Sequence, residues 1–230
     1  MMDPTAPVSG SGAPPARGIG FGRLRGATVA VAVVVGVLWL VELVNLASGN
    51  RLDDLGIRPR SLVGLVGILA APLLHLSVVH LVDNTVLLAL LGWIGLVANA
   101  RRFVAATGIV WMTSGTGVWL LGASGTVVVG ASGVIYGWLA YLVARGWVAR
   151  RLGQSLLGAV LLVTMGFSMV WGLLPLVPAH VSWLGHLSGA VGGVLAALVL
   201  DARRRSRSGP TPMPATVPTM PTLPTSPPRV

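Results

Sequence analysis

The chain has 230 residues, of which 54% are hydrophobic and only 10% are charged. Soluble domains carry roughly 25% charged residues, so this composition excludes an ordinary water-soluble domain and predicts a protein embedded in a lipid bilayer. The net charge of +10 does not indicate nucleic-acid binding, because the basic residues are arginines in short clusters between apolar runs, with no basic stripe of interleaved aromatic residues.

The two ends of the chain are expected to be disordered tails. Residues 1–26 are rich in Gly, Pro and Ala, whereas residues 202–230 are first basic and then rich in Pro and Thr. Neither composition supplies enough apolar surface for a packed core. We therefore predict one membrane domain over residues 27–201, between two disordered tails.

Six apolar runs are long enough to cross a bilayer, which takes about 20 helical residues per crossing. A shorter apolar stretch at residues 61–74 suits an interfacial or re-entrant segment better than a further crossing. The predicted fold class is therefore an all-α membrane protein, a bundle of six transmembrane helices. The predicted spans are residues 27–48, 78–98, 103–121, 131–149, 155–174 and 182–201.

The arginines predict how these spans are oriented. They cluster before the first span, between the second and third, between the fourth and fifth, and after the sixth. With six spans these clusters all lie on one side of the membrane, whereas the loops on the other side carry only Arg51, Arg58 and Arg60. Because basic loops stay in the cytoplasm, both tails are predicted to be cytoplasmic.

Three separate parts of the chain place polar side chains at one depth in the predicted bundle. His80, Asp83 and Asn84 lie at the start of the second span, Ser132 opens the fourth, and His186 lies in the sixth. In the predicted orientation all of them lie near the extracytoplasmic ends of their helices. A strongly polar side chain within a span is energetically costly, so this coincidence indicates a functional site.

Ser132 is the candidate nucleophile and His186 is the candidate base. Ser132 is flanked by Gly130 and Gly133, small residues that allow another backbone to approach and leave the hydroxyl uncovered. A serine hydroxyl is a poor nucleophile until a base takes its proton, and histidine is the usual base. The chain has no cysteine, so a thiol nucleophile is excluded.

Glycines predict how the two residues come together. Gly133 and Gly137 share one face of the fourth span, and Gly189 and Gly193 share one face of the sixth. Two faces of small residues allow helices to pack closely in a membrane. We expect this contact to bring the candidate nucleophile within hydrogen-bond distance of the candidate base.

His80 and Asn84 are candidates for an oxyanion hole. They are one helical turn apart on one face, and both can donate hydrogen bonds to a developing negative charge. The backbone N–H of Ser132, at a helix start, would add a third donor. Asp83 is rotated from that face by about 60° to 100°, and we expect it to be an interfacial carboxylate paired with an arginine of the first loop.

Each of these signals also has a plainer interpretation. Gly-x-Ser-Gly is a weak motif in a membrane protein, and residues 122–125 form a second copy with Ser124 at the serine position. A single intramembrane histidine can relay protons or pack, and His80 and Asn84 could merely cross-link helices. The occurrence of all these residues at one predicted depth favours a catalytic site.

The spacing of these residues resembles that of the rhomboid family. The family has His-x-x-x-Asn in its second core helix, Gly-x-Ser-Gly at the start of its fourth, and a histidine near small residues in its sixth. Residues 80–84, 130–133 and 185–189 match these three motifs. The resemblance covers all six predicted spans.

Two further positions match the family. An additional histidine five residues before the first motif is common, and His75 occupies that position. A tyrosine four residues after the nucleophile typically packs on the catalytic histidine, and Tyr136 stands at that distance from Ser132. Ser124 has Val128 at the equivalent position, so the resemblance favours Ser132 as the nucleophile.

The resemblance implies an intramembrane serine endopeptidase that cuts transmembrane segments of other membrane proteins near the extracytoplasmic face. The implied machinery is a Ser-His dyad that forms an acyl-enzyme, and it requires no cofactor and no metal. The expected partners are the substrate's transmembrane segment and the lipid bilayer, with no nucleic acid, and the expected location is a bacterial plasma membrane. The sequence leaves the oligomeric state open. The implied residues are Ser132 and His186 for catalysis, His80 and Asn84 for the oxyanion hole, and Tyr136, Gly130 and Gly133 in support.

Two other functions stay open at this point. A non-catalytic rhomboid-like protein would bind client transmembrane helices without cutting them, although such relatives usually lack the serine or the histidine. A small transporter could use His80, Asp83 and His186 as a proton relay, but the chain shows no inverted repeat. The first loop lacks the Trp-Arg pair of many rhomboids, so the conformation of that loop does not follow from the resemblance.

Overall fold

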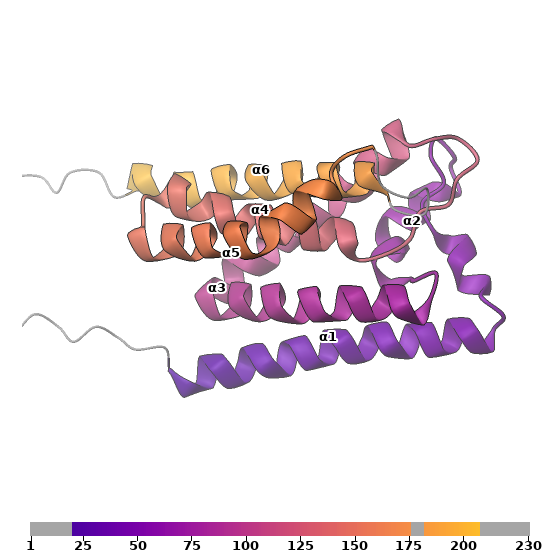
Figure 1. Cartoon of the computed structure of the whole chain (residues 1–230), viewed down its shortest axis with the longest axis horizontal. Helices are drawn as coiled ribbons and strands as arrows, with labels where there is room; N and C mark the ends of the chain where they lie inside the picture. Colours follow the sequence, from indigo (N-terminus) through magenta and orange to yellow (C-terminus); the bar gives the residue numbers. More distant parts are fainter. Residues whose placement is uncertain (1–19, 176–181, 208–230) are drawn as a thin grey trace, which may run out of the picture.

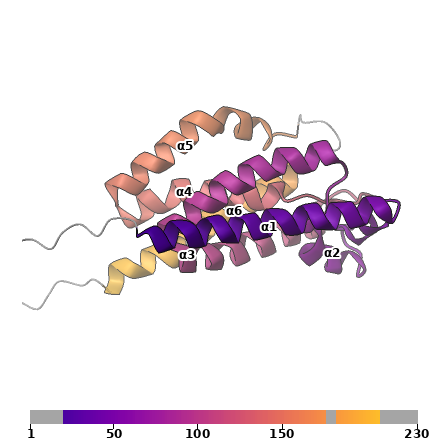
Figure 2. The same cartoon turned by 90° about the horizontal axis from the view of Figure 1, so that it is seen from below.

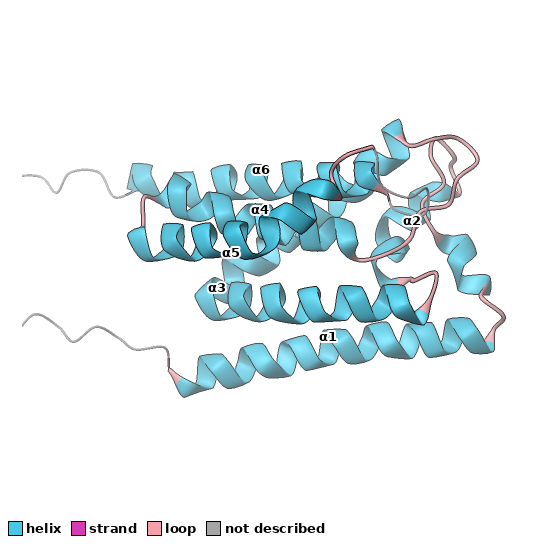
Figure 3. Cartoon of the chain, in the orientation of Figure 1, coloured by secondary structure: helices cyan, strands magenta, loops and turns pink. Residues whose placement is uncertain are grey.

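The computed structural model describes residues 20–175 and 182–207, and within these ranges the chain is all-helical, with no strand (Figure 3). The predicted all-α class is therefore confirmed for this part of the chain. Short 3₁₀ helices lie at Arg51–Leu55 (η1) and Ala71–Leu73 (η2). The α-helices are α1 (Phe21–Ala47), α2 (Gly64–Ala70), α3 (Val78–Leu121), α4 (Ser132–Ala149), α5 (Leu152–Trp171) and α6 (Trp183–Arg207) (Figure 1).

Helix α3 consists of two antiparallel segments divided at Asn99. The backbone of Asn99 is extended, with φ −168° and ψ 94°, and its side-chain oxygen accepts a hydrogen bond of 3.0 Å from the backbone N–H of Arg102. This is the N-cap of a new helix. The ring of Phe103 packs against Gly95, a contact that a straight helix would forbid because eight residues span about 12 Å. The predicted spans 78–98 and 103–121 correspond to these two segments.

Two helices are longer than the predicted spans. Helix α1 begins at Phe21 and not at residue 27, and α6 continues to Arg207, beyond residue 201. The predicted spans include only the apolar residues that can lie within the bilayer. The helices themselves continue beyond the apolar runs, because arginine is a good helix former. The rest of the two predicted disordered tails, residues 1–19 and 208–230, lies outside the described residues.

The chain is an integral membrane protein whose apolar side chains face outward. Helix α1, helix α3 and the Trp183–Asp201 part of α6 are long and apolar enough to cross a membrane. Large hydrophobic side chains such as Val33 and Leu40 are exposed along α1, where water would penalise them and lipid would not. The short apolar stretch predicted at residues 61–74 forms α2 and η2.

Helices α4 and α6 touch backbone to backbone. A Cβ atom added at Gly189 would collide with the carbonyl of Gly133, and one at Gly193 would collide with the carbonyl of Gly137. The predicted close contact between these two glycine faces is therefore confirmed. The two segments of α3 pack around this pair, while α5 packs against α4 on the outside of the bundle (Figure 2).

A cluster of charged side chains is buried at the end of the bundle where α1 starts and α6 finishes (Figure 1). Arg102, just after the turn in α3, donates to the carboxylate of Asp201 in α6 at 2.5 Å, and Asp201 is only 1% exposed. Arg145 of α4 is 3% exposed, and its guanidinium carbon lies 5.3 Å from the centre of the Tyr141 ring. The ion pair ties α3 to α6 at this end, and the buried Arg145 lies on α4.

Asp201→Ala should destabilise the protein strongly, because it removes the buried carboxylate of α6 that pairs with Arg102 of α3. Removing one partner of a buried ion pair costs about 3–5 kcal/mol, so we expect that loss in the free energy of unfolding measured in a denaturing detergent. Asp54→Ala is the matched control, because Asp54 pairs with Arg58 on the surface and its side chain is 75% exposed. Its loss should cost less than about 1 kcal/mol. Equal effects of the two variants would contradict a buried anchor at Asp201.

Candidate active site

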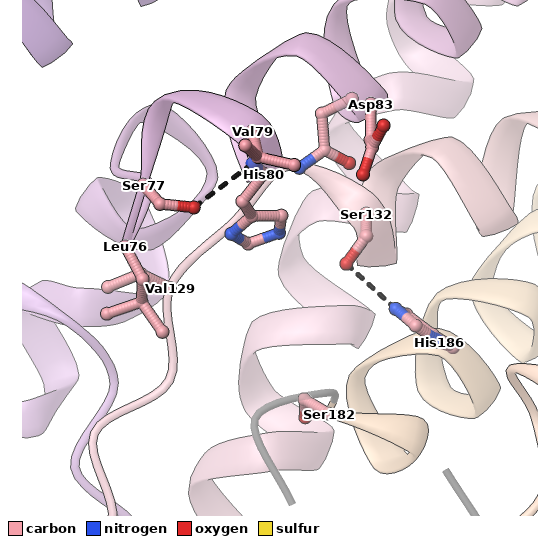
Figure 4. Close-up of a pocket in the computed structure, with 10 residues that line it drawn as sticks. Leu76, Ser77, Val79, His80, Asp83, Val129, Ser132, Ser182 and His186 are labelled. Atoms are coloured by element: carbon pink, nitrogen blue, oxygen red, sulfur yellow. Dashed lines mark hydrogen bonds between the residues drawn. The ribbon is translucent and has the colours of Figure 1, made fainter. Parts of the chain in front are cut away.

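The predicted polar residues line one cavity of about 440 Å³ (Figure 4). The cavity lies at the start of α6, whereas Asp201 lies near the end of that helix. The start of α3, the start of α4 and the start of α6 meet there. We call it the Ser132 cavity. Its lining residues are Leu76, Ser77, Val79, His80, Asp83, Asn84, Val129, Ser132, Ser182 and His186.

Ser132 is the first residue of α4, and the glycines beside it fix its position. Gly130 has φ +119°, a conformation that favours glycine, and its N–H donates to the carbonyl of Ala71 at 2.8 Å. A Cβ atom at Gly130 would also press on the His80 ring. Gly133 lies against the Ser114 hydroxyl and the Gly185 carbonyl, so any side chain there would push α6 away.

His186 is buried in α6 and makes two hydrogen bonds through its ring. Ser182 begins this helix, because its hydroxyl accepts from the N–H of Gly185 at 3.2 Å. The Nδ1 atom of His186 lies 2.8 Å from the carbonyl oxygen of Gly172, and Nε2 lies 2.8 Å from the Ser132 hydroxyl (Figure 4).

These two contacts define the tautomer of His186. A carbonyl oxygen can only accept, so Nδ1 carries the proton and donates it to Gly172. Nε2 of the neutral ring is then an acceptor, and the Ser132 hydroxyl donates to it. The arrangement suits general-base removal of the serine proton, with a backbone carbonyl orienting the base.

Tyr136 stacks face to face on His186, as the resemblance implies. The ring centres are 4.0 Å apart and the planes differ by 4°. A Cβ atom at Gly172 would collide with the Tyr136 hydroxyl. A glycine at this position therefore leaves room for the Tyr136 ring while its carbonyl contacts His186. Gly172 could not be identified from the sequence, because a backbone acceptor has no signature in residue type.

His80 and Asn84 both line the cavity from α3. Asn84 is 4% exposed, and its side-chain nitrogen has no hydrogen-bond partner among residues 20–175 and 182–207. The His80 ring is in edge contact with His75, with ring centres 5.1 Å apart. Burial, together with the neighbouring His80, lowers the pKa of His75 to about 4, so His75 is neutral at pH 7.

The two Gly-x-Ser-Gly copies lie in different surroundings. Ser124 is exposed in the segment after α3, and its hydroxyl accepts a hydrogen bond from Arg60. Arg60 also donates to the carbonyl of Leu120 at 3.1 Å. Through these two contacts Arg60 links the first loop to the end of α3 and to the segment that contains Ser124. Only the copy with Ser132 contacts a histidine in the described part of the chain.

The expected pairing of Asp83 with a first-loop arginine is wrong. Arg58 pairs with Asp54 at 2.7 Å, and Arg60 is engaged by Ser124. Asp83 instead lines the Ser132 cavity and forms no ion pair within the described ranges. The reason is the rotation of α3, which turns the Asp83 face as well as the His80 face toward the cavity.

No group of three or more His, Cys, Asp or Glu side chains that could hold a metal ion is present among residues 20–175 and 182–207. The residues that line the cavity offer hydroxyl, imidazole, amide and carboxylate groups.

Comparison with known proteins identifies one family and several relatives. The family model described as Rhomboid domain matches residues 63–203. Proteins from Mycobacterium tuberculosis and Mycobacterium bovis, both described as uncharacterized, are 44% identical over 182 residues, which cover 76% of this chain and 75% of each relative. A Mycobacterium leprae protein, also described as uncharacterized, is 39% identical over 184 residues, covering 77% of this chain and 72% of its own. No solved structure matches the chain.

Proposed function

This chain belongs to the rhomboid family, and from that premise we propose that it is an intramembrane serine protease that cleaves transmembrane segments of other membrane proteins. The family consists mostly of such proteases. The observation that carries the proposal is the hydrogen bond of 2.8 Å between the Ser132 hydroxyl and Nε2 of His186.

The proposed topology has six crossings with both ends in the cytoplasm. The crossings would be α1, the two segments of α3, α4, α5 and α6. The start of α1, the turn at Asn99 and the end of α6 lie at one end of the bundle, which supports termini on the same side (Figure 1). The excess of arginine at that end favours the cytoplasm, and it would place the Ser132 cavity at the extracytoplasmic face.

The proposed reaction begins when Nε2 of His186 takes the Ser132 proton as the hydroxyl oxygen attacks the substrate carbonyl. The proton on Nδ1 stays on the ring, and the Gly172 carbonyl stabilises the resulting imidazolium. His186 then passes a proton to the leaving amine, which breaks the peptide bond and leaves an acyl-enzyme. A water molecule, deprotonated by the same Nε2, releases the acyl group and restores Ser132.

The negative charge on the tetrahedral intermediate needs donors. The buried amide of Asn84 and the backbone N–H of Ser132 are suited to this role, since a first helical residue has no intrahelical carbonyl partner. His80 lines the same cavity and is a third candidate.

The substrate must expose a peptide bond that a transmembrane helix normally keeps hydrogen-bonded. Helix-breaking residues near the extracytoplasmic end of the substrate's transmembrane segment should therefore favour cleavage. The resemblance to the rhomboid family implies that small residues are favoured at the cleaved bond. Lipid and the substrate segment are the proposed partners, in a bacterial plasma membrane.

Ser132→Ala should abolish cleavage of a model transmembrane substrate reconstituted in lipid vesicles, because no other group replaces the nucleophile. Loss of a serine nucleophile lowers kcat by on the order of 10⁶-fold. Ser124→Ala removes only the hydroxyl that holds Arg60, so most of the activity should remain. If the wild-type protein binds the substrate without cutting it, the chain is instead a non-catalytic binder of client helices.

Asn84→Ala should lower kcat by about 10²–10³-fold, since removal of one oxyanion donor has effects of this size. The melting temperature should stay close to that of the wild type, because the Asn84 side-chain nitrogen donates to no described residue. Both quantities are measured on the same sample. A lowered melting temperature with unchanged kcat would make Asn84 a structural residue that cross-links helices.

A further inference from the structure

Asp83 is a carboxylate that the proposed reaction does not use. It lines the Ser132 cavity together with the candidate nucleophile, and among the described residues it is the only acidic one in the lining. Figure 4 shows Asp83 among the residues that line the cavity, near Ser132 in this view. The nucleophile, the base and the proposed oxyanion donors account for the chemistry, so Asp83 is available for another task.

The carboxylate stands at the end of an apolar row. Val79 and Asp83 are four residues apart on one face of α3. Leu76 lies just before the helix and lines the same cavity. Val79 is 71% exposed and Leu76 is also exposed, and both line the cavity. An apolar row that ends in a carboxylate matches the shape of a lysine or arginine side chain, with its aliphatic stem and cationic tip.

The charge of Asp83 is not neutralised by the described part of the protein. Neither of the ion pairs found in residues 20–175 and 182–207 includes it, and no arginine lines the cavity. Near the apolar region of a membrane the attraction between opposite charges is stronger than in bulk water. The Asp83 carboxylate would thus bind a cationic side chain of a substrate favourably.

We propose that Asp83 is a specificity-determining residue that binds the ammonium or guanidinium group of a lysine or arginine close to the cleaved bond of the substrate. The inference rests on the proposed protease function and deepens it by naming a substrate class. The stem of the basic side chain lies over Val79 and Leu76, and its tip reaches the carboxylate. In the proposed orientation such substrates carry a basic residue at the extracytoplasmic end of a span, where basic residues are less frequent.

The test uses model transmembrane substrates that carry Lys, Gln or Glu, in turn, at each of the four positions on either side of the cleaved bond. The readout is the ratio of kcat/KM for the Lys substrate to kcat/KM for the Glu substrate at the same position. For the wild-type protein we expect a ratio of at least about tenfold at one or more positions. Asp83→Asn should bring that ratio to about one, and Asp83→Lys should reverse it.

The controls separate this inference from the proposed function. Asp54→Asn removes another exposed carboxylate, one that does not line the cavity, and should keep the wild-type ratio. If Asp83→Asn changes the rates for all substrates by one factor and leaves the ratio unchanged, Asp83 has no role in specificity and the inference is wrong, while the protease function stands. If the wild-type protein cuts no substrate of the set and Ser132→Ala behaves identically, the proposed function fails and this inference fails with it.

Discussion

Direct contact between the backbones of α4 and α6 is the constraint on which the candidate site depends. Gly133 and Gly137 on one helix face Gly189 and Gly193 on the other, and a side chain at Gly189 or Gly193 would collide with a carbonyl of α4. Only this approach leaves the hydroxyl at the start of α4 and the imidazole of α6 2.8 Å apart. A hydrogen bond is lost beyond about 3.5 Å. If a methyl group at this contact pushed the two helices apart, the hydrogen bond between the serine and the histidine would therefore break.

Contacts at both ends of the bundle hold the helices and the histidine ring of this site in position. At the far end, Asp201 pairs with Arg102 and links α6 to α3, and Arg145 of α4 is buried. Separating the helices there would expose these buried charges. At the near end, the Gly172 carbonyl holds the proton on Nδ1 of His186. Because Gly172 directly follows α5, a helix on the outside of the bundle leads to the group that orients the base (Figure 2).

Much of this arrangement could be predicted from the sequence, since it follows from composition and helical periodicity. The Arg101–Arg102 break between two apolar runs marks the turn at Asn99, and the glycine spacing marks the faces that meet. Three features could not be predicted. The Gly172 acceptor is a backbone atom, which residue type does not reveal. Asp201 lies at the end of an apolar run beside arginines, so its sequence position suggests a residue of the membrane surface and not a buried partner of Arg102. The direction of Asp83 depends on the rotation of α3 about its axis, which only tertiary packing determines.

The central claim is that contact with His186 activates Ser132, and covalent labelling tests it most directly. A fluorophosphonate probe reacts with an activated serine, and peptide mapping by mass spectrometry identifies the residue that carries it. The account predicts labelling of the folded wild-type protein at Ser132, no labelling of Ser132→Ala, and strongly reduced labelling of His186→Ala. A label at Ser124, or labelling of Ser132 that does not change in His186→Ala, would contradict it.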